Sequence, residues 1–271
     1  LTFFASCQAI IAAKMKPVIC DIDLNNAVID PKDLEKKITK KTKAIMIINV
    51  LSNCSDLFKI KKIAKKNNLI LFEDNCESLG SKFKNKNLGT FGDFSTFSFF
   101  YSHQITSGEG GMVTCNNEKD YEILFSLRSH GWLGGLMSYP RNMLAYRKLA
   151  RKFPKLDQRY IFSNSGFNLR PMDINAAIGL NQFKHLNSFK SNRNKNRSRI
   201  LNKLISSKDW KNQFEFIGPR EDLDPSWMVM PILVNQKYKN IKKKFLEFLD
   251  KNGVETRPII SGSFNNQPAY K

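Results

Sequence analysis

The chain has 271 residues, of which 41% are hydrophobic and 11% aromatic. This composition excludes an intrinsically disordered protein and is sufficient for one large and one smaller folded unit. The net charge of +20 is unusual, but the lysines are spread over the whole sequence, which disfavours a nucleic-acid-binding surface and favours a solvated exterior.

No stretch approaches the roughly 20 consecutive apolar residues that a membrane-spanning helix needs, so the sequence predicts no membrane segment. The five cysteines are scattered, and none forms a C-x-x-C pair. This pattern predicts neither a disulfide framework nor a zinc site, and it is typical of a cytoplasmic protein. We also expect the chain to be truncated at both ends, because it starts and stops abruptly and has no initiator methionine.

Strand-like and helical runs alternate in the first half of the chain. Residues 44–50 and 69–72 are apolar runs, as expected for strands buried in a parallel sheet. Between them, Asp56 is a predicted N-cap of a helix with one apolar and one lysine-rich face. Two more strands are predicted at 96–100 and 112–115. The alternation predicts an α/β domain with a mainly parallel sheet, whose ligand site lies at the carboxyl ends of the strands.

The second half is predicted to be less regular and to end in a small α+β unit. Its predicted elements are helices at 118–129 and 171–186, a polar helix or linker at 190–203, a strand at 228–234, a helix at 238–250 and a strand at 254–259. The helix at 171–186 is expected to bury Ile174, Ala177, Ile178 and Phe183. We therefore predict a cofactor-binding large domain at 1–190 and a small domain at 191–271.

Asp74 follows the second buried strand and is the first residue that suggests a chemistry. An ionised carboxylate at this place suits a pyridine cofactor, because it keeps the ring nitrogen protonated and the ring electron-deficient. On its own, an acidic residue after a strand could equally be a helix N-cap.

Four motifs occur in order along the chain. They are Glu73-Asp74, the segment from Gly92 to Gly111 that contains Phe-Ser-Phe-Phe-Tyr-Ser-His-Gln-Ile-Thr-Ser-Gly-Glu-Gly-Gly, Arg128-Ser129-His130-Gly131, and Gly166-Phe167-Asn168-Leu169-Arg170-Pro171 before an Ala-Ala-Ile-Gly-Leu helix. Together they resemble the DegT/DnrJ-type family of sugar aminotransferases and dehydratases, over essentially the whole chain.

The resemblance implies the type I fold of aminotransferases that use pyridoxal 5′-phosphate (PLP) and its amine form (PMP), and a homodimer with shared active sites. It assigns Asp74 to the pyridine nitrogen, Ser98 to the cofactor phosphate and Glu77 to the surroundings of the cofactor. Phe3 would stack on the pyridine ring, and Asn168 would reach the phosphate of the neighbouring subunit's cofactor.

The main departure from the aminotransferase pattern is His103, which stands where those enzymes carry the lysine that binds the cofactor covalently. Histidine cannot form a stable link of that kind, but it can act as a general base near neutral pH. The sequence resembles a dehydratase branch with this histidine. That branch removes the C3 hydroxyl from a nucleotide-linked 4-keto-6-deoxy sugar, with L-glutamate as amino donor. The resemblance also implies that Arg170 and Arg257 bind substrate.

The branch has one arm that uses a CDP-sugar and an iron–sulfur cluster, and another that uses GDP-4-keto-6-deoxymannose without a cluster. Residues 128–168 contain no cysteine, and a cluster normally needs four thiolates. We therefore expect no iron–sulfur cluster or other metal, and a role in making dideoxy sugars for surface polysaccharide such as O-antigen. The alternatives are a family member acting on another nucleotide sugar and an inactive homologue that only binds ligands. A further departure is Ser52, where the family usually has glycine.

Overall fold

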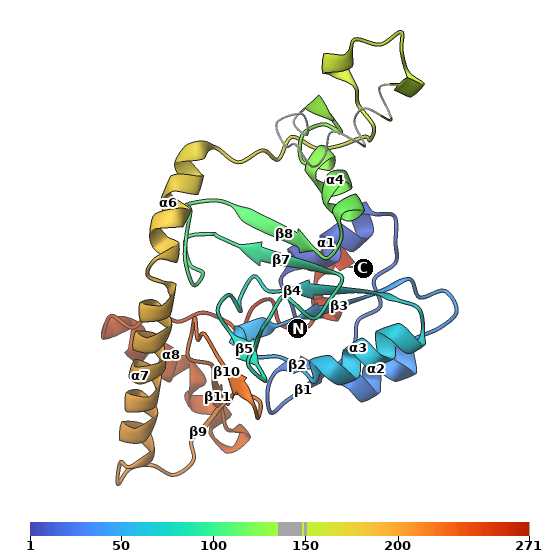
Figure 1. Ribbon diagram of the computed structural model, residues 1–271. Coiled ribbons are helices and arrows are strands. Elements are labelled where there is room, and N and C mark those ends of the chain that lie inside the picture. Colours follow the sequence, from blue (N-terminus) through green and yellow to red (C-terminus); the bar gives the residue numbers. More distant parts are fainter. Residues whose placement is uncertain (135–147, 149–150, 271) are drawn as a thin grey trace.

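A four-stranded sheet forms the centre of the computed structural model, which describes residues 1–134, 148 and 151–270 (Figure 1). Its strands, in spatial order, are β3 (Ala44–Ile48), β4 (Ile70–Asp74), β7 (Phe94–Ser98) and β8 (Gly111–Cys115). The first three are parallel and β8 is antiparallel to β7. The predicted mainly parallel sheet is confirmed, and β4 and β7 end at the same edge.

Helices and three small antiparallel ladders surround this sheet. The helices are α1 (Phe4–Ala12), α2 (Pro31–Lys37), α3 (Leu57–Lys66), α4 (Glu118–Leu127), α6 (Asp173–Phe183), α7 (Leu186–Ile205) and α8 (Lys242–Lys251). The ladders pair β1 (Ile22–Asp23) with β2 (Val28–Ile29), β5 (Lys82–Phe83) with β6 (Lys86–Asn87) and β10 (Leu223–Asp224), and β9 (Phe214–Phe216) with β11 (Ile232–Val234). None of the helices within the described ranges is long and apolar enough to cross a bilayer.

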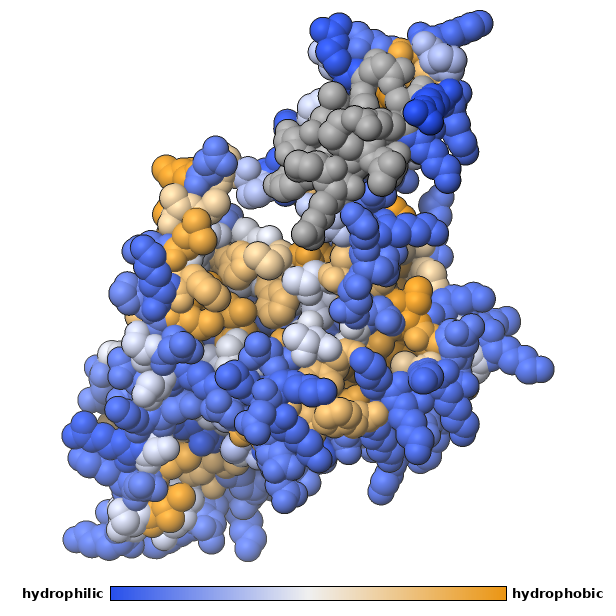
Figure 2. All heavy atoms as spheres, in the orientation of Figure 1, coloured by the Kyte–Doolittle hydropathy of each residue, from blue (hydrophilic) through white to orange (hydrophobic). Residues whose placement is uncertain are grey.

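Hydrophilic side chains cover most of the face seen in Figure 2, and hydrophobic side chains gather in a band across its middle and at the upper end of α6. This face is therefore polar and is interrupted by exposed apolar surface.

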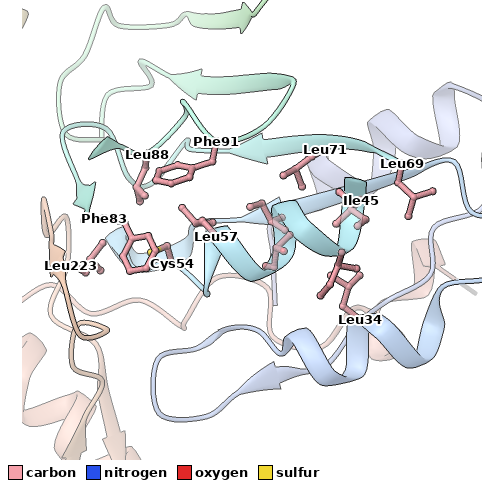
Figure 3. Packing of buried hydrophobic residues seen from close by; sticks show 14 residues of the cluster. Leu34, Ile45, Cys54, Leu57, Leu69, Leu71, Phe83, Leu88, Phe91 and Leu223 are labelled. Atoms are coloured by element: carbon pink, nitrogen blue, oxygen red, sulfur yellow. The ribbon is translucent and has the colours of Figure 1, made fainter. Parts of the chain in front are cut away.

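The main core lies between the sheet and α3, as the sequence predicts. Asp56 caps α3 by accepting a hydrogen bond from the Lys59 backbone N–H. The apolar face of α3, including Leu57, packs against Ile45 and Leu71 of the sheet and against α2 (Figure 3). Full burial of a side chain such as Leu57 contributes roughly 1.5–3 kcal/mol, so this contact is a large part of what holds the sheet in place.

The other face of the sheet carries Asp74. Because side chains alternate along a strand, the burial of Leu71 against α3 places Phe72 and Asp74 on the opposite face. The register pairs Asp74 with Thr96 of β7. Helix α1 meets the carboxyl end of β4, where the Ser6 hydroxyl donates to Asp74.

Glu73 fixes the backbone beneath this edge. Its side chain is 1% exposed and accepts hydrogen bonds from the backbone N–H groups of Gly89, Phe91 and Gly92 at 2.6–2.9 Å, and from Asn49 Nδ2 at 3.3 Å. The fit is close, since a Cβ on Gly92 would lie 2.7 Å from the Leu71 carbonyl oxygen. One carboxylate thus ties the turn before β7 to the ends of β3 and β4.

We expect Glu73→Gln to destabilise the protein by about 3–5 kcal/mol, because the amide turns an NH₂ group toward buried N–H donors. Urea unfolding followed by circular dichroism would measure this loss. The matched control is Glu247→Gln on the exposed surface of α8, which should change stability by no more than about 0.5 kcal/mol. Equal midpoints for the two variants would contradict the role of Glu73.

One expected element is absent and two are shorter than expected. Residues 254–259 form no strand, since no neighbouring segment in the described part pairs with them. The strand expected at 228–234 is only β11, because Pro231 lacks the N–H that a ladder needs. The helix expected at 171–186 ends at Phe183, and its apolar stripe is not buried: Ile174 is 66% exposed. The side of α6 that meets the rest of the chain carries Asn175 instead, whose amide donates to the Ser107 carbonyl oxygen.

Helix α7 is continuous through the expected domain boundary at 190/191. It has no buried apolar face, and polar side chains attach it to backbone carbonyl groups instead. Lys190 binds Gly80 O, Arg193 binds Gln104 O, Asn194 binds Pro225 O, and Arg197 binds Ile217 O. The division into 1–190 and 191–271 stays a prediction, and α7 would belong to both parts.

Candidate active site

Asp74 lies at the carboxyl end of β4 and is held from two sides. Its Oδ2 accepts a hydrogen bond of 2.8 Å from the Ser6 hydroxyl, and its Oδ1 accepts one of 3.1 Å from the Cys76 backbone N–H. Ser6 Oγ in turn lies 2.9 Å from Thr2 Oγ1. The carboxylate therefore has a fixed orientation at the junction of α1 and the sheet.

His103 lies in the loop that follows β7 and reaches the same place. Its backbone N–H donates to the Phe100 carbonyl oxygen at 3.1 Å, and its imidazole interacts with the Cys76 backbone. Burial lowers the pKa of His103 below its ordinary value, and this outweighs the Cys76 backbone and the Asp74 charge, which both raise it. Nδ1 is buried and has no hydrogen-bond partner among the described residues. His103 thus has a half-buried imidazole with an unpaired nitrogen, and its lowered pKa favours the neutral form, which can accept a proton.

We expect the His103 pKa, measured by NMR titration of the imidazole signals, to lie below the ordinary value of about 6.5. The chain has three histidines, so loss of one signal in His103→Asn assigns it. Because the folded-state pKa is lowered, the neutral form persists to lower pH, and any rate that needs it falls only below about pH 6.5. Asp74→Asn should lower the pKa further. A wild-type value at or above 6.5 would contradict this description.

Glu77 and Ser98 complete a polar group at the same edge of the sheet. Glu77 Oε2 accepts from the Leu51 backbone N–H at 2.8 Å. Desolvation raises the pKa of Glu77, the Asp74 charge adds to the increase, and the Leu51 hydrogen bond opposes it. Ser98 is the last residue of β7, and its hydroxyl accepts from the Phe100 N–H at 3.3 Å.

The other four expected site residues are less closely associated with this group. Phe3 precedes α1 by one residue, and its ring is 66% exposed and free to stack on a ligand. Arg257 binds Glu255 and comes within 3.5 Å of the Tyr101 hydroxyl, two residues before His103.

Asn168 and Arg170 are exposed and lie elsewhere. Asn168 forms an isolated bridge with Ser129 at the end of α4. A single chain therefore brings together Asp74, Glu77, Ser98 and His103, but does not add Asn168.

Sequence reasoning missed Ser6 and Gln104. Ser6 orients Asp74 across 68 positions of sequence, and no motif marks it. Gln104 is fully buried beside His103, and its place next to the key residue of a motif was the one available signal.

The residues present fit the pyridine ring of a cofactor. Asp74 offers a fixed carboxylate for a protonated ring nitrogen, Phe3 offers an exposed aromatic face, and the unpaired Nδ1 of His103 offers a proton acceptor. No lysine is needed for any of these contacts.

The fold is the type I fold of PLP-dependent aminotransferases, as the similarity to solved structures shows. The structure resembles that of Escherichia coli GDP-4-keto-6-deoxy-D-mannose-3-dehydratase with bound hydrated PLP. The TM-score is 0.82 at 31% identity, covering 99% of this chain and 66% of that one. It also resembles Helicobacter pylori PseC, an aminotransferase of pseudoaminic acid biosynthesis. There the TM-score is 0.79 at 29% identity, covering 98% and 68%.

The chain belongs to the DegT/DnrJ/EryC1/StrS aminotransferase family, whose profile matches residues 1–271. It is 37% identical over 244 residues to GDP-4-keto-6-deoxy-D-mannose 3-dehydratase of Escherichia coli O55:H7, covering 90% of this chain and 60% of the relative. It is 33% identical over 260 residues to GDP-perosamine synthase of Escherichia coli O157:H7, covering 96% and 63%. The chain thus spans about three fifths of the length of these curated relatives, and the expected fold and family are confirmed.

Proposed function

We propose that the protein containing this chain is a PLP/PMP-dependent C3 dehydratase of a nucleotide-linked 4-keto-6-deoxy sugar. The observation that carries the proposal is His103, a half-buried imidazole with a lowered pKa and an unpaired Nδ1, beside Asp74 where the family's aminotransferases have lysine. GDP-4-keto-6-deoxymannose is the favoured substrate, because two similar relatives are named as dehydratases of that sugar.

The bound cofactor would supply an electron-accepting ring. Asp74 would keep the ring nitrogen protonated, Ser98 would bind the phosphate, and Phe3 would stack on the ring. Glu77, whose pKa is raised by burial, would lie beside the cofactor.

His103 would accept a proton from the C4′ carbon of the cofactor and return it to the C3 hydroxyl, which would leave as water. L-glutamate would provide the amino group and end as 2-oxoglutarate, and the nitrogen would be released as ammonia. The planar guanidinium groups of Arg170 and Arg257 suit the carboxylate of glutamate or the phosphates of the substrate.

A homodimer with shared active sites is part of the proposal. Exposed apolar side chains continue from the segment before α6 along that helix: Phe167, Leu169, Met172, Ile174, Ile178, Leu180 and Phe183. Figure 2 shows such side chains at the upper end of α6. Single folded chains rarely leave so many neighbouring apolar residues in water. Asn168 lies within this segment, and the family resemblance implies that it would reach the partner's cofactor.

The test is incubation of the full-length protein with PLP, L-glutamate and GDP-4-keto-6-deoxymannose, followed by mass spectrometry of the sugar. We expect a sugar that lacks the C3 oxygen, with 2-oxoglutarate and ammonia released. An amino sugar would show transamination, the activity in the name of the GDP-perosamine synthase relative, and would overturn the proposal. An unchanged sugar, with cofactor bound, would direct the search to other nucleotide sugars.

A further inference from the structure

Gln104 joins the loop of His103 to three other segments of the chain. Its side chain is 1% exposed, and its Nε2 donates to the Glu77 carbonyl oxygen at 2.6 Å, to Ser52 Oγ at 3.2 Å and to the Ser226 carbonyl oxygen at 3.3 Å. A buried amide NH₂ group needs hydrogen-bond acceptors within the protein, because leaving it unpaired is costly. Gln104 finds these acceptors on three separate segments, so its side chain connects them.

We propose that Gln104 is a positioning residue, which holds the His103 loop in register with the segment after β4 so that the imidazole stays against Cys76 and Asp74. This inference rests on the proposed function of His103 as the base.

The register follows from two neighbouring contacts. The His103 imidazole interacts with the Cys76 backbone, and the next residue, Gln104, binds the carbonyl group of Glu77. Consecutive residues of one loop thus meet consecutive residues of the other, so the loop cannot slide without breaking the 2.6 Å hydrogen bond. The Gln104 carbonyl oxygen also accepts from Arg193 of α7 at 3.2 Å, which holds the loop from the other side.

Ser52 supports the same arrangement. It has a φ of +60°, in the left-handed region that favours glycine. Its hydroxyl lies 2.8 Å from the Glu77 carbonyl oxygen and also contacts Gln104 and the Ser226 carbonyl oxygen. Strained backbone of this kind persists where the surroundings determine it. Glycine, the family's usual residue at this position, has no side chain. The Ser52 hydroxyl therefore adds contacts to the Gln104 hydrogen-bond network that glycine could not make.

The test compares Gln104→Met, which keeps the volume of the side chain and removes its donors, with the control Gln236→Met at an exposed position. The first readout is NMR titration of the histidines in the protein without ligands. Because burial lowers the His103 pKa, a released loop should raise it toward the ordinary value in Gln104→Met, with His130 and His185 unchanged. The control should match wild type.

The second readout is the rate of dehydration. We expect kcat to fall roughly 10- to 100-fold in Gln104→Met with KM nearly constant, because misplacement of the base affects the reaction more than binding. An unshifted His103 pKa in a folded Gln104→Met protein would overturn the proposal. This result does not depend on the substrate, so it remains decisive even if the proposed dehydration is wrong.

Ser52→Gly is the second variant, for the case that Gln104→Met does not fold. It removes the hydroxyl and relieves the left-handed strain, so the fold should be retained. A smaller rise of the His103 pKa would support the network, and no change would overturn it.

Discussion

Replacing His103 with asparagine should reduce dehydration by about 10²- to 10⁴-fold, the usual contribution of a general acid or base. Asparagine is polar and of similar size, but it has no basic nitrogen to replace the unpaired Nδ1 of His103. Binding of the cofactor should be little changed, because the proposed contacts to the ring and phosphate come from Asp74, Ser98 and Phe3. The measurements are the rate of sugar deoxygenation and the cofactor affinity from an absorbance titration.

The matched control is His130→Asn. His130 is exposed and has a φ of +61°, a conformation that asparagine adopts readily. This variant should keep the wild-type rate. If His103→Asn were as active as His130→Asn, another group would have to be the base.

Asp74→Asn should lower kcat by about 10²- to 10³-fold, a loss typical for removal of one electrostatic contact to the reacting group. The amide has the shape of the carboxylate; its oxygen can keep the hydrogen bond from the Cys76 N–H while its NH₂ group donates to the Ser6 hydroxyl, so the fold should be retained. It cannot stabilise a positive charge on the ring nitrogen, so the cofactor should also bind more weakly. Steady-state kinetics and a cofactor titration measure the two effects.

Ser6→Ala is the companion variant, because it leaves the Asp74 charge and removes only the group that orients Oδ2. We expect a smaller loss of kcat than in Asp74→Asn. Wild-type kinetics in Asp74→Asn would contradict the assignment of this carboxylate to the cofactor ring.

The sequence predicted those parts of the fold that local patterns determine. The capped amphipathic helix α3 and the buried strands β3 and β4 follow from the spacing of apolar residues and from Asp56. Asp74 could be placed at a strand end for the same reason. His103 was singled out through the motif around it, because a lone histidine in a loop carries no such signal.

The remainder depends on contacts between distant segments. The hydrogen bonds from Ser6 to Asp74 and from Gln104 to Ser226 join residues 68 and 122 positions apart, and no local pattern contains them. The stripe of α6 was wrongly expected to be buried because amphipathicity indicates that a helix has an apolar side, and does not indicate whether the same chain covers it. A strand pattern at 254–259 likewise forms no strand, because no segment of the described residues pairs with it.

The most direct test of the account asks whether the cofactor becomes attached to the protein. The full-length protein would be mixed with PLP and reduced with borohydride, and its mass would be measured by intact-protein mass spectrometry. His103→Lys is the control that shows that trapping is efficient. The account predicts that wild type gains no mass while His103→Lys gains one cofactor. A cofactor bonded to a lysine of the wild-type protein would show that His103 has not replaced the covalent residue, and would contradict the central claim.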